Sequence, residues 1–325
     1  MMLRPVGWIS FVALLFSSIT GPATAATEKR VALVIGNAAY TNITPLKKPI
    51  SDAHRVAEVL KGLGYEVILG TDASKLELEN LAQKFRAAVR GAEVGFFYYS
   101  GHGFQTNRVE QPHPVNHIVP VDFKVQEVDA RLATLALDVI VETLKREVRV
   151  GFIFMDACRN DPQLAAASER VANSRSVVIS RGFSPVNVVA ELPVAAKGKQ
   201  GARKGPTGLL IAYATDPGNV ALEGEKGLFS PFTGALVKHM ATPGLSIAEV
   251  MGLVSADVSS ETQGQQTPWN VSSLTVGTYQ FLPKPPQTAA PTRPRAAPTA
   301  RSTGGGANRT NNLPPNLSAG GGAGL

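Results

Sequence analysis

The chain has 325 residues, of which 44% are hydrophobic and 18% are charged, which is an ordinary balance for a folded core. Its net charge is +7, but the basic residues concentrate in the stretch 159–206 and in the tail from Lys284 onward, so we expect no nucleic-acid partner. The single cysteine, Cys158, excludes a disulfide within the chain. It is either a small buried residue or a reactive thiol.

The first 25 residues have the order of a secretory signal peptide. Arg4 supplies the positive region, residues 7–17 form an apolar run, and Ala23-Thr24-Ala25 matches a small-x-small cleavage site. The apolar run is shorter than the roughly 20 residues that a membrane-spanning helix needs. We therefore expect a secreted or periplasmic protein with no membrane span in its mature chain; a retained N-terminal anchor is the alternative.

Strands and helices are predicted to alternate through the central part of the chain. Apolar runs predict strands at 31–37, 65–69, 94–100, 148–157, 208–215 and 273–282. Apolar residues at helical spacing predict helices at 51–63, 75–90, 135–146, 231–240 and 246–258. This order predicts an α/β fold with a six-stranded, mostly parallel sheet and helices on both faces.

The domain boundaries follow from the same pattern. Residues 30–283 are predicted to form one domain, with the basic stretch 159–206 as a loop inside it. The tail 284–325 is rich in Pro, Gly and Ala and is expected to be disordered. Ser51 or Asp52 is expected to cap the first helix of the domain.

His102 and Cys158 follow the third and fourth predicted strands, at the end of a parallel sheet where ligands bind. A thiolate is a good nucleophile, and an imidazole can accept the proton of the thiol. Glycines on both sides of His102 permit a sharp turn and a close approach of substrate. The backbone amides of Gly103 and Cys158 are the candidates for stabilising an oxyanion.

The blocks FFYYSGHG at 96–103 and FIFMDACRND at 152–161 resemble the two signatures of caspase-like cysteine peptidases (peptidase C14), most closely those of bacterial metacaspases and paracaspase-like proteins. Other blocks between residues 30 and 282 resemble the same families in the same order. The resemblance implies the caspase–hemoglobinase fold and a cysteine endopeptidase. It implies His102 as base, Cys158 as nucleophile, and the Gly103 and Cys158 amides as oxyanion hole.

The residues around the cysteine bear on specificity. Animal caspases cut after aspartate and carry Gln-Ala-Cys-Arg-Gly, whereas this chain has Asp156 two residues before Cys158. In metacaspases and paracaspases, that position and an aspartate of the early helix, here Asp52, line an acidic S1 pocket. Two carboxylates favour a cationic side chain, so the resemblance implies peptide or protein substrates cut after Arg or Lys. Asp216 and Glu223 both lie in the block where some relatives carry a third acidic residue.

Several alternatives stay open at this level. The basic stretch is either a solvated loop or a site of self-cleavage, with candidate positions at Arg175, Arg181, Lys197, Lys199, Arg203 and Lys204. Neither a metal site nor a dinucleotide site is predicted, and we expect no cofactor. Some metacaspases need calcium, and the sequence leaves calcium dependence and oligomeric state open. The alternative to an enzyme is a catalytically silent caspase-fold module that binds peptides.

Overall fold

The computed structural model describes residues 28–108, 114–124, 132–158, 177–180, 207–216, 221–224, 227–275 and 279–285. These residues belong to one compact unit that extends to Pro285. The predicted signal peptide, most of the basic stretch and the tail from residue 286 lie outside the described residues. No helix within the described ranges is long and apolar enough to cross a membrane.

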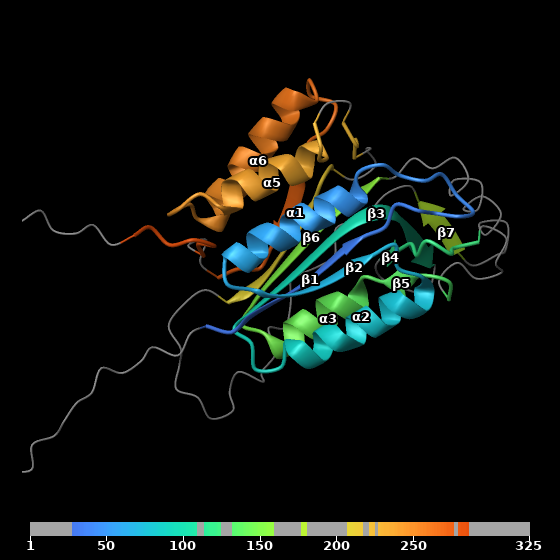
Figure 1. The fold of residues 1–325 in the computed structure, drawn as a ribbon, viewed down its shortest axis with the longest axis horizontal. Coiled ribbons are helices and arrows are strands. Elements are labelled where there is room, and N and C mark those ends of the chain that lie inside the picture. Colours follow the sequence, from blue (N-terminus) through green and yellow to red (C-terminus); the bar gives the residue numbers. More distant parts are fainter. Residues whose placement is uncertain are drawn as a thin grey trace, which may run out of the picture. The chain divides into compact units, whose positions relative to one another are not determined.

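The centre of the fold is a sheet with the strand order β2-β1-β3-β6-β8-β9 (Figure 1). Its strands are β1 (Arg30–Gly36), β2 (Glu66–Thr71), β3 (Val94–Arg108), β6 (Val150–Cys158), β8 (Gly208–Tyr213) and β9 (Trp269–Ser272). The first five are parallel to one another, and β9 pairs antiparallel with β8. The prediction of a six-stranded, mostly parallel sheet is confirmed.

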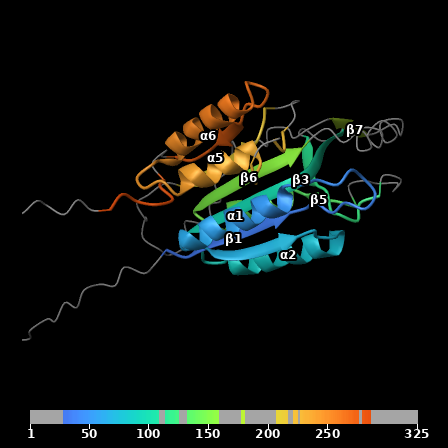
Figure 2. The same cartoon turned by 45° about the horizontal axis from the view of Figure 1, so that its top comes forward.

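Helices cover both faces of this sheet (Figures 1 and 2). One face carries α1 (Pro49–Gly62), α5 (Pro231–Met240) and α6 (Ile247–Glu261), and the other carries α2 (Lys75–Ala88) and α3 (Asp138–Glu147). Successive strand residues point to opposite faces, so Val34 packs in the first layer and Leu33 in the second. Both faces are buried, which explains why the parallel strands are continuous apolar runs.

The third strand is longer than predicted. It does not end at Ser100 but continues through His102 to Arg108, where it pairs antiparallel with β4 (Val115–Ile118) and β7 (Val177–Ser180). A short strand, β5 (Leu135–Ala136), pairs with β4, so α3 begins only at Asp138. Polar residues such as Gln105 fill this extension, and hydrophobic patterning therefore did not predict it. Part of the basic stretch is thus a strand of this extension.

The last predicted strand, 273–282, is wrong in position. The strand that pairs with β8 is β9, in which Trp269 and Val271 pack inward while Asn270 and Ser272 are exposed. This edge strand has one buried face, so its sequence is not a continuous apolar run. Tyr279 and Phe281 instead enter the core without forming a strand; both rings pack on Phe152 of β6, and the Tyr279 carbonyl accepts the amide hydrogen of Ile247 at the start of α6.

The start of α1 also differs from the prediction. The helix begins at Pro49 with Lys48 as its N-cap, so neither Ser51 nor Asp52 is the cap. Proline suits the first helical position because its nitrogen has no hydrogen to leave unbonded. Gly36, the last residue of β1, lies so close that a Cβ there would be 2.2 Å from the Pro49 carbonyl oxygen. This close approach sets the first turn of α1, and Asp52 with it, beside the end of the sheet.

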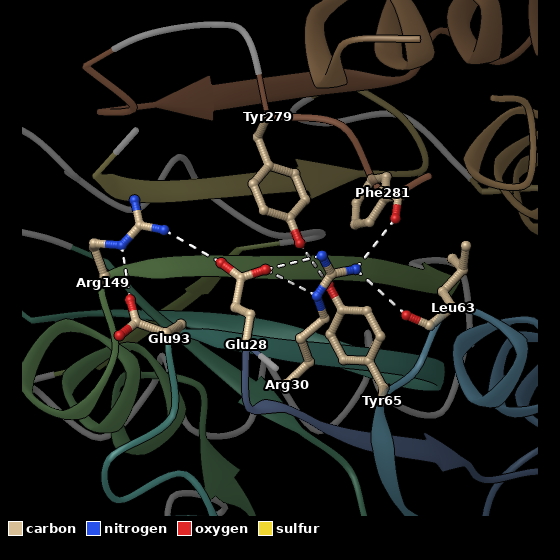
Figure 3. A network of polar contacts seen from close by, with 8 residues as sticks. All are labelled: Glu28, Arg30, Leu63, Tyr65, Glu93, Arg149, Tyr279 and Phe281. Atoms are coloured by element: carbon tan, nitrogen blue, oxygen red, sulfur yellow. Dashed lines mark hydrogen bonds and ion pairs between the residues drawn. The ribbon is translucent and has the colours of Figure 1, made fainter. Parts of the chain in front are cut away.

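An ionic network joins the opposite, amino-terminal ends of the strands (Figure 3). The Arg30 guanidinium bonds Glu28 at 2.8 Å and donates to the Phe281 carbonyl oxygen at 3.2 Å. Arg149 bonds Glu28 at 3.3 Å and Glu93 at 2.9 Å. The network ties the starts of β1, β3 and β6 to the last described segment of the chain, far along the strands from His102.

Candidate active site

His102 and Cys158 occupy facing positions on neighbouring strands. In the parallel pair of β3 and β6, the backbone of His102 is in register with that of Cys158. Adjacent strands lie roughly 4.8 Å apart, so the two positions are close in space. The side chain of Cys158 lies outside the described residues. The fold therefore brings together the two chain positions that the sequence predicted to meet.

The imidazole of His102 is buried and oriented by a backbone carbonyl. Its Nε2 lies 2.8 Å from the carbonyl oxygen of Thr44, in the loop between β1 and α1. A carbonyl only accepts hydrogen bonds, so Nε2 carries the hydrogen in this contact. In the neutral ring the lone pair is then on Nδ1, and Nδ1 is the nitrogen that can accept a proton.

Two tyrosines hold the backbone on either side of this imidazole. The His102 amide donates to the Tyr40 hydroxyl at 2.8 Å, and the Tyr99 hydroxyl donates to the His102 carbonyl at 2.7 Å. The Tyr40 ring also packs on the imidazole, with 4.6 Å between ring centroids. A Cβ on Gly101 would lie 2.5 Å from the Tyr99 hydroxyl and 2.7 Å from that of Tyr40, so glycine is required there. The sequence reasoning missed Tyr40 and Thr44, which carry no motif of their own.

Gly103 lies at the first position of the antiparallel pairing between β3 and β4, opposite Ile118. The next residue of that segment, Val119, donates its amide hydrogen to the His102 carbonyl at 3.2 Å. The backbone around the histidine is therefore fixed by strand pairing on both sides. The role of the Gly103 and Cys158 amides as an oxyanion hole stays a prediction.

Asp52 of α1 and Asp156 of β6 meet beside this pair. Ser230 bonds both of them, because its amide donates to Asp52 Oδ1 at 2.9 Å and its hydroxyl donates to Asp156 Oδ2. Ser100, two positions before His102, donates its hydroxyl to Asp52 Oδ2 at 3.3 Å. Asp52 is 1% exposed and Asp156 is 4% exposed, so the pair is covered rather than lining an open pocket.

Burial and proximity change the ionisation of the two carboxyl groups. Burial and the nearby charge of Asp156 raise the pKa of Asp52 to about 8. Burial also raises the pKa of Asp156, while hydrogen bonds from Ser230, Thr233 and Tyr98 oppose that rise. Two carboxylates this close do not both ionise readily. With its pKa raised to about 8, Asp52 is mostly protonated at neutral pH.

Three hydroxyl groups converge on one oxygen of Asp156. Besides Ser230, Thr233 donates to Asp156 Oδ2 at 2.7 Å and Tyr98 approaches it at 3.4 Å. Ser230 is the N-cap of α5, Thr233 lies in the first turn of that helix, and Tyr98 lies in β3. Sequence reasoning singled out none of the three, although Ser230 and Thr233 lie in the block SPFTGALVKHM that resembles the family.

Glu223 and Lys48 border the same region. Glu223 Oε1 accepts from the backbone amides of Lys47 at 2.7 Å and Lys48 at 3.2 Å, at the start of α1. Its charge contributes to the raised pKa of Asp156, so of the two acidic candidates Glu223 is electrostatically coupled to the pair. Asp216 accepts from the hydroxyl of its neighbour Thr215. The Lys48 ammonium donates to the Phe229 carbonyl at 3.0 Å and lowers the pKa of Asp52.

The part of the chain that the structure describes holds no group of three or more His, Cys, Asp or Glu residues arranged to bind a metal ion.

A family model described as the Peptidase C14 caspase domain matches residues 29–279. The human mucosa-associated lymphoid tissue lymphoma translocation protein 1 is 32% identical over 78 residues, which are 24% of this chain and 10% of the human protein. Its mouse homolog is also 32% identical over 78 residues, or 9% of that protein. The matched part thus spans about a tenth of these curated relatives.

Solved structures give more distant likenesses. A protein from Geobacter sulfurreducens is 15% identical, with a TM-score of 0.47, and the match covers 79% of this chain and 94% of that one. The Drosophila initiator caspase Dronc is 12% identical, with a TM-score of 0.46, and the match covers 85% of this chain and 94% of that one.

Proposed function

Because this chain belongs to the caspase domain family of peptidases, we propose that it is a cysteine endopeptidase with a dyad of His102 and Cys158. Membership of a peptidase family implies protein or peptide substrates. The observation that carries the proposal is the register of His102 with Cys158 on adjacent parallel strands. The bond from His102 Nε2 to the Thr44 carbonyl supports it, because that bond leaves Nδ1 as the basic nitrogen.

The proposed reaction has two stages. His102 Nδ1 takes the proton of the Cys158 thiol, and the thiolate attacks the scissile carbonyl carbon. The amides of Gly103 and Cys158 stabilise the oxyanion, and His102 then gives its proton to the leaving amine. Water, deprotonated by the same imidazole, attacks the thioester, which releases the acid product and restores the thiol.

The acid pair supports specificity for Arg or Lys at the cleavage site. Asp156 lies two residues before the proposed nucleophile in the same strand, and Asp52 lies against it through Ser230. An incoming guanidinium or ammonium group would favour the ionised form of both carboxyl groups. An aspartate side chain would meet a like charge in a buried setting. Export through the N-terminal 25 residues, to the periplasm or the outside of the cell, is part of the same proposal.

One observation favours a second candidate, a caspase-fold module that binds peptides without cutting them. Both carboxyl groups are almost completely buried, which also fits a pair that only ties α1, β6 and α5 together. In that case the hydrogen bonds of Ser230 would serve stability alone. Labelling of the thiol separates the two candidates.

The test uses an arginyl chloromethyl ketone and its aspartyl counterpart on the purified full-length chain, followed by mass spectrometry. The dyad predicts rapid alkylation of Cys158 by the arginyl reagent. It also predicts a loss of about a hundredfold or more in rate for His102→Ala, the scale of general-base contributions. Iodoacetamide serves as the control for accessibility of the thiol. Reaction of Cys158 with iodoacetamide but with neither peptide reagent would support the silent module.

A further inference from the structure

We propose that Ser230 is a positioning residue for substrate selection, which fixes Asp156 so that its Oδ1 atom receives the cationic side chain. The inference rests on the proposed function of Asp52 and Asp156 as the site for Arg or Lys, and it deepens that function. In this inference, the N-cap residue of α5 orients the acid pair. That residue lies far in the sequence from His102, Cys158 and the residues that flank them.

Ser230 uses each of its polar groups on a different partner. It is the N-cap of α5, where its hydroxyl oxygen accepts the Thr233 amide hydrogen at 3.0 Å. The hydrogen of that hydroxyl goes to Asp156 Oδ2, and the Ser230 amide goes to Asp52 Oδ1. One residue therefore sets both carboxylates relative to each other and to the helix that covers them.

The hydroxyl groups of Ser230 and Thr233 both donate their hydrogens to the same oxygen of Asp156. Thr233 donates to Oδ2, so the close contact between the Tyr98 and Thr233 hydroxyls is a donation from Tyr98. Within the described residues, every hydrogen bond to this carboxylate ends on Oδ2. Oδ1 is then the oxygen that remains for a ligand, and the donated hydrogens oppose the rise that burial causes in the pKa of Asp156.

This arrangement predicts a difference between the two basic side chains. A guanidinium is planar and donates through a rigid fork, so it needs both carboxylates at a fixed separation and orientation. An ammonium is a compact charge that tolerates rotation of its partner. Loss of the Ser230 hydroxyl frees Asp156 to rotate and should weaken binding of a guanidinium more than binding of an ammonium.

Ser246 provides a matched control. It is the N-cap of α6, its hydroxyl accepts the Glu249 amide hydrogen at 3.3 Å, and Glu249 bonds back to it in a capping box. Ser246→Ala therefore removes a helix cap of the same kind without altering a hydrogen bond to Asp52 or Asp156. Ser230→Thr is the rescue variant, because it keeps the hydroxyl and the cap.

The experiment measures binding of agmatine and of butylamine by calorimetry at pH 8, on the full chain carrying Cys158→Ala. Adding Ser230→Ala should weaken agmatine binding about tenfold or more, as expected for a lost charge-assisted hydrogen bond, and butylamine binding less. Ser246→Ala should change neither affinity by more than about twofold, and Ser230→Thr should restore both.

The inference would be overturned if Ser230→Ala and Ser246→Ala changed the affinity for agmatine equally, or if Ser230→Ala weakened the binding of agmatine and of butylamine equally. It would also be overturned if the Cys158→Ala protein with Ser230 intact did not bind agmatine. Binding at the acid pair does not require the dyad to work. Peptide cleavage by the unmodified protein tests the proposed function separately, so failure of one does not imply failure of the other.

Discussion

Asp52 is the residue whose ionisation the fold changes most clearly. Burial and the neighbouring Asp156 raise its pKa from 3.8 to about 8. Between these values the folded chain holds a proton that the unfolded chain has released. The free energy of unfolding must therefore fall as pH rises through this window, because the unfolded state binds fewer protons than the native state.

We predict that Asp52→Asn removes this dependence. The amide keeps an oxygen for the Ser230 amide hydrogen but has no proton to lose. The stability of the variant relative to the unmodified protein should grow by up to about 4 kcal/mol from pH 5 to pH 8, at 1.4 kcal/mol per pKa unit. Urea unfolding of both proteins at pH 5 and pH 8 measures this difference in the free energy of unfolding.

Glu58→Gln is the control for Asp52→Asn, because the Glu58 side chain is 71% exposed. Its stability relative to the unmodified protein should be nearly the same at both pH values. If the free energy of unfolding of Asp52→Asn differed from that of the unmodified protein by the same amount at pH 5 and pH 8, the proposed proton on Asp52 would be contradicted.

Single residues of the site were predictable only where they belong to a short local pattern. His102 lies between two glycines and Cys158 follows Asp156, and both blocks are recognisable in the sequence. Ser230 bonds Asp52 across 178 positions of the chain, and no local pattern encodes such a contact. The burial of the acid pair was likewise not predictable, because it depends on how α1 and α5 pack against β6.

At the scale of elements, the helices were predicted better than the ends of the strands. α2 was predicted at 75–90 and is found at Lys75–Ala88, where Ser74 and Glu77 form a capping box. The extension of β3 and the edge strand β9 were missed because one-sided or polar strands lack a continuous apolar run. The extension matters for the site, because it holds His102 inside a paired strand.

The ionic network around Arg30 is expected to stabilise the fold by joining the amino-terminal ends of β1, β3 and β6. Arg30→Met should lower the free energy of unfolding by about 1–3 kcal/mol, because it removes one of the two arginines that bond Glu28 and the Arg30 hydrogen bond to the buried Phe281 carbonyl. Activity per folded molecule should not change, since the network lies at the amino-terminal ends of the strands (Figure 3). Chemical unfolding and active-site titration provide the two measurements.

The matched control is Arg55→Met. Arg55 pairs with Glu58 at 2.6 Å on the surface of α1, where the two side chains are 40% and 71% exposed. Exposed pairs of this kind contribute at most about 1 kcal/mol. If Arg30→Met lowered the free energy of unfolding no more than Arg55→Met, the network would not stabilise the packing of the strand ends.

At the scale of the whole molecule, the alternation of strands and helices predicted the sheet, and the order of the family blocks predicted the family. The described residues place the proposed dyad and the acid pair at one end of the strands and the ionic network at the other. The predicted signal peptide and tail lie outside the described residues, so export stays a prediction from the sequence.

We propose that one end of the sheet combines a Cys158–His102 dyad with an acid pair that selects Arg or Lys. Hydrolysis of matched fluorogenic peptides ending in Arg, Lys or Asp, by the purified full-length chain and its Cys158→Ala variant, tests it most directly. We predict cleavage after Arg and Lys, none after Asp, and no cleavage by the variant. Cleavage after Asp, or cleavage that survives in Cys158→Ala, would contradict it.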